Sequence, residues 1–157
     1  MEYIIRELKQ EEVEVLDTFL YEAIFIPEGI EAPSKDIIEQ PELQVYIDEF
    51  GNKQGDICFV AEIDNTIIGA VWVRIMNDYG HIDDATPSFA ISLLKEYRGD
   101  GIGTKLMVQM LDELRKQGYE KASLAVQKMN YAVRMYKKVG FEVIDENEEE
   151  YIMVCKL

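Results

Sequence analysis

The chain has 157 residues, of which 48% are hydrophobic and 30% charged, a composition typical of a folded protein rather than a disordered one. Its 31 acidic and 16 basic residues give a net charge of −15, which opposes binding to nucleic acid or to an anionic membrane surface. We expect a single domain over residues 1–157, because this length suits one core and no repeat, linker or low-complexity tract divides it.

The apolar runs, the N-terminal residues and the few Cys and His residues indicate a cytoplasmic protein without a metal. The longest apolar run, 67–73, is far shorter than the roughly 20 residues of a spanning helix, and Glu2 opens a terminus unlike a signal peptide. Cys58 and Cys155 fall in apolar, strand-like stretches, so we expect two buried thiols in a reducing compartment. One His and two separated Cys residues do not have the spacing of a zinc site, and we expect no metal.

The first third of the chain predicts one strand and two helical regions. Residues 3–6 favour a short strand, and residues 10–25 carry apolar side chains three and four positions apart, which predicts an amphipathic helix. Ser34 is a suitable N-cap for a second helical region, which Pro41 divides or kinks.

The middle third predicts a strand-rich region. Residues 57–63 and 67–75 are rich in β-branched and aromatic residues, and the short polar turn between them predicts an antiparallel hairpin. A polar connection follows over 77–87. Residues 88–94 then predict a strand that is too apolar for an exposed sheet edge.

The last third alternates helices and strands. An amphipathic helix is expected over 101–117, a strand over 121–127, a short helix over 130–140, and two strands over 141–144 and 151–156. The element order is therefore β-α-α-β-β-β-α-β-α-β-β. This order predicts a mixed α/β sheet with helices on its faces.

The most informative segment is the glycine-rich stretch 98–104, RGDGIGT, which lies between a predicted strand and a predicted helix. Glycines allow a tight turn, and the first N–H groups of a helix have no internal partners. Because the helix dipole adds partial positive charge, such a turn can bind a phosphate even in an acidic protein.

Three interpretations of this segment can be compared from the residues alone. A P-loop requires Gly-x-x-x-x-Gly-Lys-Ser/Thr, which is absent. A dinucleotide fingerprint requires Gly or Ala where Thr104 stands, and an acid near the end of the next strand, where Gln127 and Lys128 lie. The third interpretation is a structural turn without a ligand.

The pattern Arg98-x-x-Gly101-x-Gly103 resembles the acyl-CoA pyrophosphate loop of the GNAT superfamily of N-acetyltransferases, which reads Gln/Arg-x-x-Gly-x-Gly/Ala. The later segment 130–141, NYAVRMYKKVGF, resembles the second conserved block of that family. The resemblance implies a GNAT-like fold. Such a fold has a central, mostly antiparallel sheet, a splayed pair of parallel strands that binds acyl-CoA, and helices on both faces.

The resemblance also implies acetyl-CoA as the co-substrate. Three strand residues would pair with the pantetheine arm through their main chain, the loop would hold the pyrophosphate, and an asparagine would touch the arm. The residues that it assigns to the cofactor are Ile91, Ser92, Leu93, Arg98, Gly99, Asp100, Gly101, Ile102, Gly103, Thr104 and Asn130. Asp100 stands where basic residues are common in the family, so its carboxylate either points to solvent or weakens binding. Asn130 stands six residues before Tyr136, whereas the commonest family spacing is seven.

Tyr136 is the catalytic residue that the resemblance implies. A phenol can protonate the thiolate that leaves when an amine attacks the thioester. From the residues alone, Tyr136 is also a candidate core residue, because it lies at helical spacing with Ala132 and Val139. The base that takes the amine proton is left open among His81, the nearby acids Asp83 and Asp84, and water.

The predicted activity is therefore N-acetylation of a primary amine, on a small molecule or a peptide, by direct attack in a ternary complex. No Cys in either motif supports an acyl-enzyme route. Candidates for the acceptor pocket, of which the aromatic members also suit the core, are Tyr21, Phe25, Glu28, Glu31, Tyr46, Phe50 and Trp72. The alternatives are a non-catalytic acyl-CoA-binding or regulatory module on the same fold, and a dinucleotide-binding module. The resemblance allows a homodimer, although no residue specifies an interface.

Overall fold

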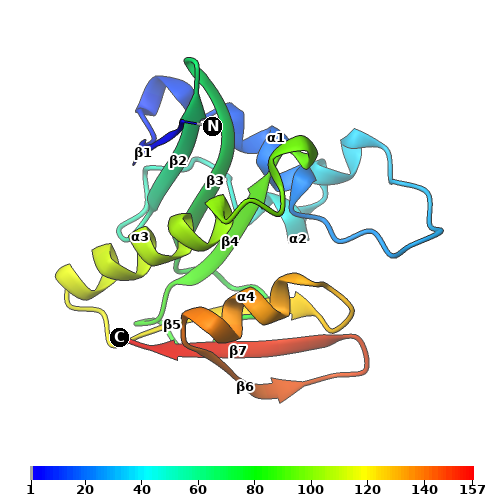
Figure 1. The fold of residues 1–157 in the computed structure, drawn as a ribbon. Helices are drawn as coiled ribbons and strands as arrows, with labels where there is room; N and C mark the ends of the chain where they lie inside the picture. The colour runs from blue at the N-terminus through cyan, green and yellow to red at the C-terminus, as the bar shows by residue number, and fades with distance from the viewer. Residues whose placement is uncertain (1) are drawn as a thin grey trace.

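The computed structural model describes residues 2–157, and its strands form one seven-stranded mixed sheet (Figure 1). The strands are β1 (Ile4–Glu7), β2 (Ile57–Ile63), β3 (Thr66–Arg74), β4 (Ser88–Leu93), β5 (Lys121–Gln127), β6 (Phe141–Glu146) and β7 (Glu150–Lys156). Their order in the sheet is β1-β2-β3-β4-β5-β7-β6, and every neighbouring pair is antiparallel except β4 with β5. The predicted mostly antiparallel sheet with one parallel pair is confirmed.

Four α-helices connect these strands. They are α1 (Val15–Glu22), α2 (Pro41–Gln44), α3 (Ile102–Lys116) and α4 (Ala132–Val139), and single 3-10 turns lie at Gln10–Glu12, Lys35–Glu39 and Lys95–Tyr97. The helix predicted over 10–25 is too long, because α1 ends at Glu22 and the apolar side chains that follow it line a cavity instead. Pro41 divides the second helical region as predicted, since it is the first residue of α2, a position that tolerates proline.

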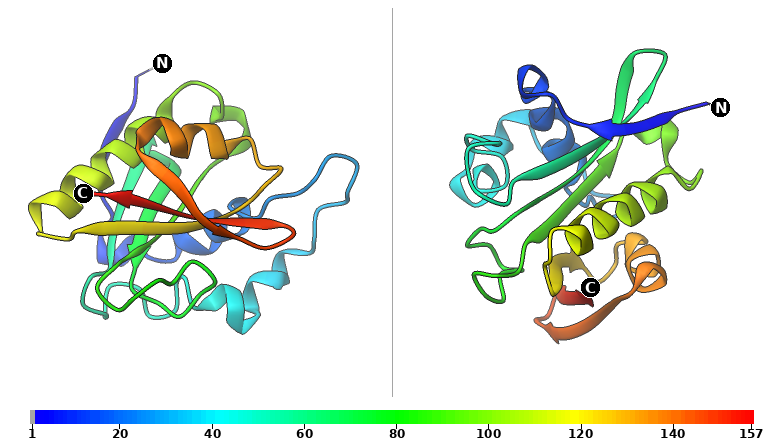
Figure 2. Two further views of the ribbon diagram at one scale, coloured as in Figure 1. Left: turned by 90° about the horizontal axis from the view of Figure 1, so that it is seen from below. Right: turned by 90° about the vertical axis from the view of Figure 1, so that its left-hand side faces the viewer.

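Helices pack on both faces of the sheet, as expected (Figure 2). Successive side chains of its central strands point to opposite faces, so each face has apolar side chains for a helix to cover. The β2 and β3 side chains that pack in the core beneath α3 are Phe59, Ala61, Ile68, Val71 and Val73. Those that pack beneath α1 are Cys58, Val60, Ala70 and Trp72. The sheet therefore separates two apolar layers, and α1 and α3 lie on opposite sides of β3.

A buried arginine anchors the segment after α2 to the end of β3. The Arg74 guanidinium is 0% exposed and donates to both carboxylate oxygens of Asp56, at 3.0 and 2.8 Å. It also donates to the carbonyls of Val45 and Asp48, at 3.1 and 2.8 Å, and lies over the Phe50 ring. Burial alone would raise the pKa of the Asp56 carboxyl, but hydrogen bonds from Arg74 and from two backbone amides hold this pKa below its ordinary value.

Both cysteine thiols are free and buried, as predicted for Cys58 and Cys155. In the described part of the chain, no helix combines the length and hydropathy needed to cross a membrane. Residues 2–157 also contain no group of three or more His, Cys, Asp or Glu side chains that could hold a metal ion.

Candidate active site

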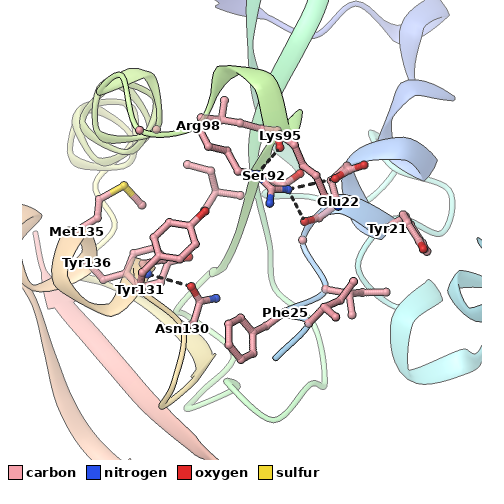
Figure 3. Close-up of a pocket in the computed structure, with 18 of the residues that line it drawn as sticks. Tyr21, Glu22, Phe25, Ser92, Lys95, Arg98, Asn130, Tyr131, Met135 and Tyr136 are labelled. Atoms are coloured by element: carbon pink, nitrogen blue, oxygen red, sulfur yellow. Dashed lines mark hydrogen bonds and ion pairs between the residues drawn. The ribbon is translucent and has the colours of Figure 1, made fainter. Parts of the chain in front are cut away.

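The parallel strands β4 and β5 splay apart soon after they meet. Their only paired residues within 2–157 are Ser88 and Ser123, where the Ser123 amide donates to the Pro87 carbonyl at 3.0 Å. Near the far end of β4, a cavity of about 770 Å³ lies between the C-terminal end of α1, the glycine-rich loop and the start of α4 (Figure 3). The expected splayed pair therefore exists, and an open cavity adjoins it.

This cavity brings together most of the residues that the sequence assigned to the cofactor and to catalysis. The predicted residues that line it are Ile91, Ser92, Leu93, Arg98, Gly99, Gly101, Gly103, Thr104, Asn130 and Tyr136. The Asp100 side chain is exposed and does not line the cavity. Ile102 is 1% exposed and packs in the core beneath the sheet, so only its backbone is free to face a ligand.

The start of α3 has the properties of an anion site. Gly99 and Gly101 have φ angles of +89° and +86°, a left-handed conformation that disfavours any residue with a Cβ. The first turn of α3 contains no acidic residue, and Gly101 provides no side-chain cap. The N–H groups of 102–104 precede the first helical hydrogen bond, from Lys105 to Gly101, and are free to donate to an anion.

The backbone of β4 presents alternate residues to the splayed side. Because the Leu94 amide donates to the Ile68 carbonyl of β3 at 2.9 Å, the backbone groups of Ser92 also face β3, and those of Ile91 and Leu93 face away from it. The Ser92 hydroxyl donates to the Phe19 carbonyl at 2.7 Å. The main-chain contact predicted for Ile91 fits this geometry, whereas the backbone groups of Ser92 face β3 and only the residue as a whole lines the cavity.

Arg98 lies at the edge of the cavity with its guanidinium engaged (Figure 3). Its Nε donates to the Leu93 carbonyl at 2.9 Å, and its Nη2 donates to the Glu22 carbonyl and carboxylate at 3.2 and 3.1 Å. Lys95 also lines the cavity, and it has no ion-pair partner among residues 2–157.

Tyr136 reaches the cavity from α4 and is 8% exposed. Its ring packs edge-on against Phe141, with centroids 6.1 Å apart, and its hydroxyl makes no hydrogen bond to any described residue. Burial, together with the nearby Tyr131, raises the pKa of the Tyr136 hydroxyl well above its ordinary value of 10.0. The phenol is therefore protonated at neutral pH, which is the state that a proton donor requires.

Asn130 and the side chains around it form the wall on the α4 side. The Asn130 Oδ1 accepts a hydrogen bond from the Ala132 amide at 2.9 Å, which caps the start of α4. Tyr131, 68% exposed, and Met135 also line the cavity, one helical turn apart (Figure 3). The sequence interpretation did not assign Tyr131 and Met135 to the site, although their spacing of four residues, from the N-cap of α4 into the helix, was visible.

The three side chains considered as the base lie elsewhere. His81, Asp83 and Asp84 precede β4, at the end opposite Leu93, and within residues 2–157 none of them lines the cavity. The His81 Nε2 lies 3.3 Å from the Asp84 Oδ1, and the Asp83 Oδ1 accepts a hydrogen bond from the Thr86 hydroxyl. These contacts hold their own loop, so the structure does not support a role for the three residues in proton transfer at this cavity.

Two of the acceptor-pocket candidates, Tyr21 and Phe25, line the cavity on the α1 side. The other candidates are outside its described lining: Glu28, Glu31, Tyr46, Phe50 and Trp72. Trp72 is fully buried beneath α1, and its indole N–H donates to the Tyr46 carbonyl at 3.1 Å. The apolar segment that follows α1, including Ile24, Ile26 and Ile30, forms the rest of this wall.

Comparison with known proteins identifies the family. Residues 20–141 match the model of the acetyltransferase (GNAT) family, and the chain therefore belongs to it. This match confirms the family that the glycine-rich loop and the α4 block had indicated.

Curated relatives and solved structures agree with this assignment. The chain is 32% identical over 101 residues to the probable N-acetyltransferase san of Drosophila melanogaster. This match covers 62% of this chain and 53% of san. It is 33% identical over 70 residues to the [ribosomal protein bS18]-alanine N-acetyltransferase of Haemophilus influenzae, covering 45% of this chain and 47% of that enzyme. The chain thus spans about half the length of these relatives. The structure of PaiA N-acetyltransferase from Thermoplasma acidophilum, in complex with coenzyme A, has a TM-score of 0.74 at 24% identity and covers 100% of both chains, which confirms the fold.

Proposed function

We propose that the chain is an acetyl-CoA-dependent N-acetyltransferase that acts on a primary amine by direct transfer in a ternary complex. The observation that carries this proposal is the position of Tyr136, a largely buried residue that lines the same cavity as the free N-terminus of α3 and whose hydroxyl has no hydrogen-bond partner in the described residues. A helix N-terminus suits a pyrophosphate, and a protonated phenol suits a leaving thiolate.

Backbone groups at two places in the cavity support acetyl-CoA as its ligand. The backbone N–H groups at 102–104 would bind the pyrophosphate, and the backbone groups of Ile91 that face away from β3 would pair with the pantetheine amides. This donor set consists of backbone amides, so it can bind an anion despite the net charge of −15. The solved complex of PaiA with coenzyme A supports the same ligand class for this chain.

The reaction follows from these positions. The neutral amine attacks the thioester carbonyl, a carbon–nitrogen bond forms, and the carbon–sulfur bond breaks as the thiolate leaves. Tyr136 donates its proton to the thiolate and regains one from solvent, and water takes the proton that the amine loses. Within residues 2–157, Glu22 is the only carboxylate that lines the cavity, and its pairing with Arg98 leaves water as the simplest base.

The acceptor that we propose is the α-amine of a peptide. Two groups of relatives support this class by name, the ribosomal-protein alanine N-acetyltransferases and the archaeal N-alpha-acetyltransferases. On this chain, the segment after α1 contributes Phe25, Ile26 and Ile30 to the cavity lining, and these side chains suit an apolar N-terminal residue better than a polyamine.

The test is release of CoA thiol from acetyl-CoA with an alanine-initiated peptide, spermidine, free alanine and kanamycin as acceptors. We expect peptide-dependent release, a fall in kcat of about 10²-fold or more in Tyr136→Phe, and unchanged acetyl-CoA affinity. Tyr119→Phe is the matched control, because Tyr119 is outside the described cavity lining, and it should keep its activity. Binding of acetyl-CoA without release on any amine would favour the alternative, a non-catalytic acyl-CoA-binding module.

A further inference from the structure

Two cationic side chains, Lys95 and Arg98, line the same cavity as the glycine-rich loop, and they are held differently. Arg98 has its Nε and Nη2 bonded to Leu93 and Glu22, and its side chain is 30% exposed. Lys95 is exposed and lacks an ion-pair partner within the residues that the structure describes. A carboxylate beside a guanidinium offsets its positive charge, so the pair attracts a phosphate less strongly than a free cation does.

The acceptors of Arg98 belong to the ends of two separate elements. Leu93 is the last residue of β4, and its carbonyl faces away from β3. Glu22 is the last residue of α1, where a helix has carbonyls without internal partners and its dipole favours a cation. The guanidinium therefore ties the C-terminal end of α1 to the C-terminal end of β4.

The chain between this tie and Pro33 forms the apolar wall of the cavity. The wall segment, residues 23–32, begins directly after Glu22 and supplies much of the lining on the α1 side. At its other end, the Tyr21 hydroxyl donates to the Pro33 carbonyl at 2.6 Å, which brings both ends of the segment together. Arg98 thus fixes one end of the wall segment, and Tyr21 fixes the other.

We propose that Arg98 is a positioning residue that holds the wall segment in place, and that Lys95 is the side-chain cation that meets the phosphates of acetyl-CoA. This division rests on the proposed function. If Arg98 turned toward a phosphate, the Leu93 and Glu22 carbonyls would lose their hydrogen-bond donor. The cost of these lost bonds opposes such a movement. Lys95 has no such bonds to break.

The experiment compares Arg98→Gln, Arg98→Lys and Lys95→Gln by two readouts that need no acceptor. Calorimetry gives the Kd for acetyl-CoA, and hydrogen exchange of the free protein reports the order of residues 23–32. We expect Lys95→Gln to raise Kd about tenfold and leave the exchange unchanged. Both Arg98 variants should leave Kd within about threefold and accelerate exchange across the wall segment, because an ammonium cannot bridge the acceptors of a planar guanidinium.

A kinetic readout separates positioning from general loss of structure. With the alanine-initiated peptide, the Arg98 variants should raise the peptide KM about tenfold while the KM for acetyl-CoA stays the same. Glu22→Gln keeps both carbonyl acceptors and should move exchange and peptide KM in the same direction by less, which serves as the second variant if Arg98→Gln does not fold.

Two results would overturn the proposal. One is a large rise in acetyl-CoA Kd in Arg98→Gln that Arg98→Lys restores, which would make Arg98 a phosphate ligand. The other is unchanged exchange across residues 23–32 in every Arg98 variant. If the unmodified protein bound no acetyl-CoA, the proposed function would fail instead, and the exchange measurement would still decide the role of Arg98.

Discussion

Arg74 and Arg98 make similar contacts in two different regions of the molecule. Arg74 is the last residue of β3 and Arg98 follows β4, and each donates to two backbone carbonyls and to one carboxylate. The Arg74–Asp56 pair is 0% and 1% exposed, whereas the Arg98–Glu22 pair is 30% and 21% exposed. One pair is enclosed by the core, and the other borders the cavity.

The difference in burial separates structural support from function. A guanidinium without solvent requires every partner, so the Arg74 anchor makes a rigid support for the segment between α2 and β2. Water can take over some of the hydrogen bonds around a partly solvated guanidinium, so the loss of Arg98 should cost the fold less than the loss of Arg74. The two regions should therefore respond differently to the same substitution.

The largest effect is expected when Arg74 is removed. Arg74→Ala leaves the Asp56 carboxylate buried without its partner, and it should lower the free energy of unfolding by about 3–5 kcal/mol. Arg98→Ala should lower it by only about 1 kcal/mol, because solvent can replace the lost bonds. Urea denaturation followed by circular dichroism measures both, and equal losses would show that the two regions do not differ.

A second effect concerns acid stability. The pKa of Asp56 is lower in the folded state than its ordinary value of 3.8, so the folded state gains stability from the ionised carboxyl above that value. This stability is lost as the pH falls through the folded pKa. We expect Asp56→Asn to be less stable at pH 7 and to lose less stability between pH 5 and pH 3. In the double variant Arg74→Ala/Asp56→Asn, the free energy of unfolding should depend on pH as it does in Asp56→Asn alone. If Asp56→Asn lost as much stability between pH 5 and pH 3 as the unmodified protein, the lowered pKa of Asp56 would be contradicted.

The smallest expected effect is a difference in stability between alanine substitutions at two glycines that line the cavity. Gly101→Ala forces an L-residue into a left-handed conformation and should lower stability by about 1 kcal/mol. Gly103 has an ordinary helical φ, and a Cβ there would meet Met135 Sδ at 3.4 Å, an acceptable contact. Gly103→Ala should therefore leave stability unchanged or raise it by up to about 1 kcal/mol. Urea denaturation of the two variants gives the comparison, and a loss in Gly103→Ala equal to that in Gly101→Ala would contradict it.

Much of the fold could be predicted because its signals are local. The β-branched and aromatic composition of β2 and β3, and the four-residue spacing of apolar residues along α3, depend only on neighbouring residues. The glycine-rich loop was visible for the same reason, since a positive φ at Gly99 and Gly101 is a local requirement. The parallel pair and the family followed from the motif at residues 98–103.

The missing parts depend on long-range contacts. The pairing of Arg98 with Glu22 joins residues 76 positions apart, and no local pattern indicates it. The apolar residues after Glu22 continued the helical period, yet they line a cavity that forms only when α1 and α4 face each other across it. Trp72 was a candidate for the acceptor pocket because it is aromatic. Its position on β3, however, places its side chain in the core that α1 covers.

The most direct test of the account is the melting temperature of the protein with acetyl-CoA, CoA and NAD. At 100 times the Kd, acetyl-CoA should stabilise the folded state by about 2.7 kcal/mol, which raises the melting temperature by roughly 5–10 °C. CoA should give a shift of similar size, and NAD none. Absence of a shift with both CoA species, or an equal shift with NAD, would contradict the assignment of this cavity to acyl-CoA.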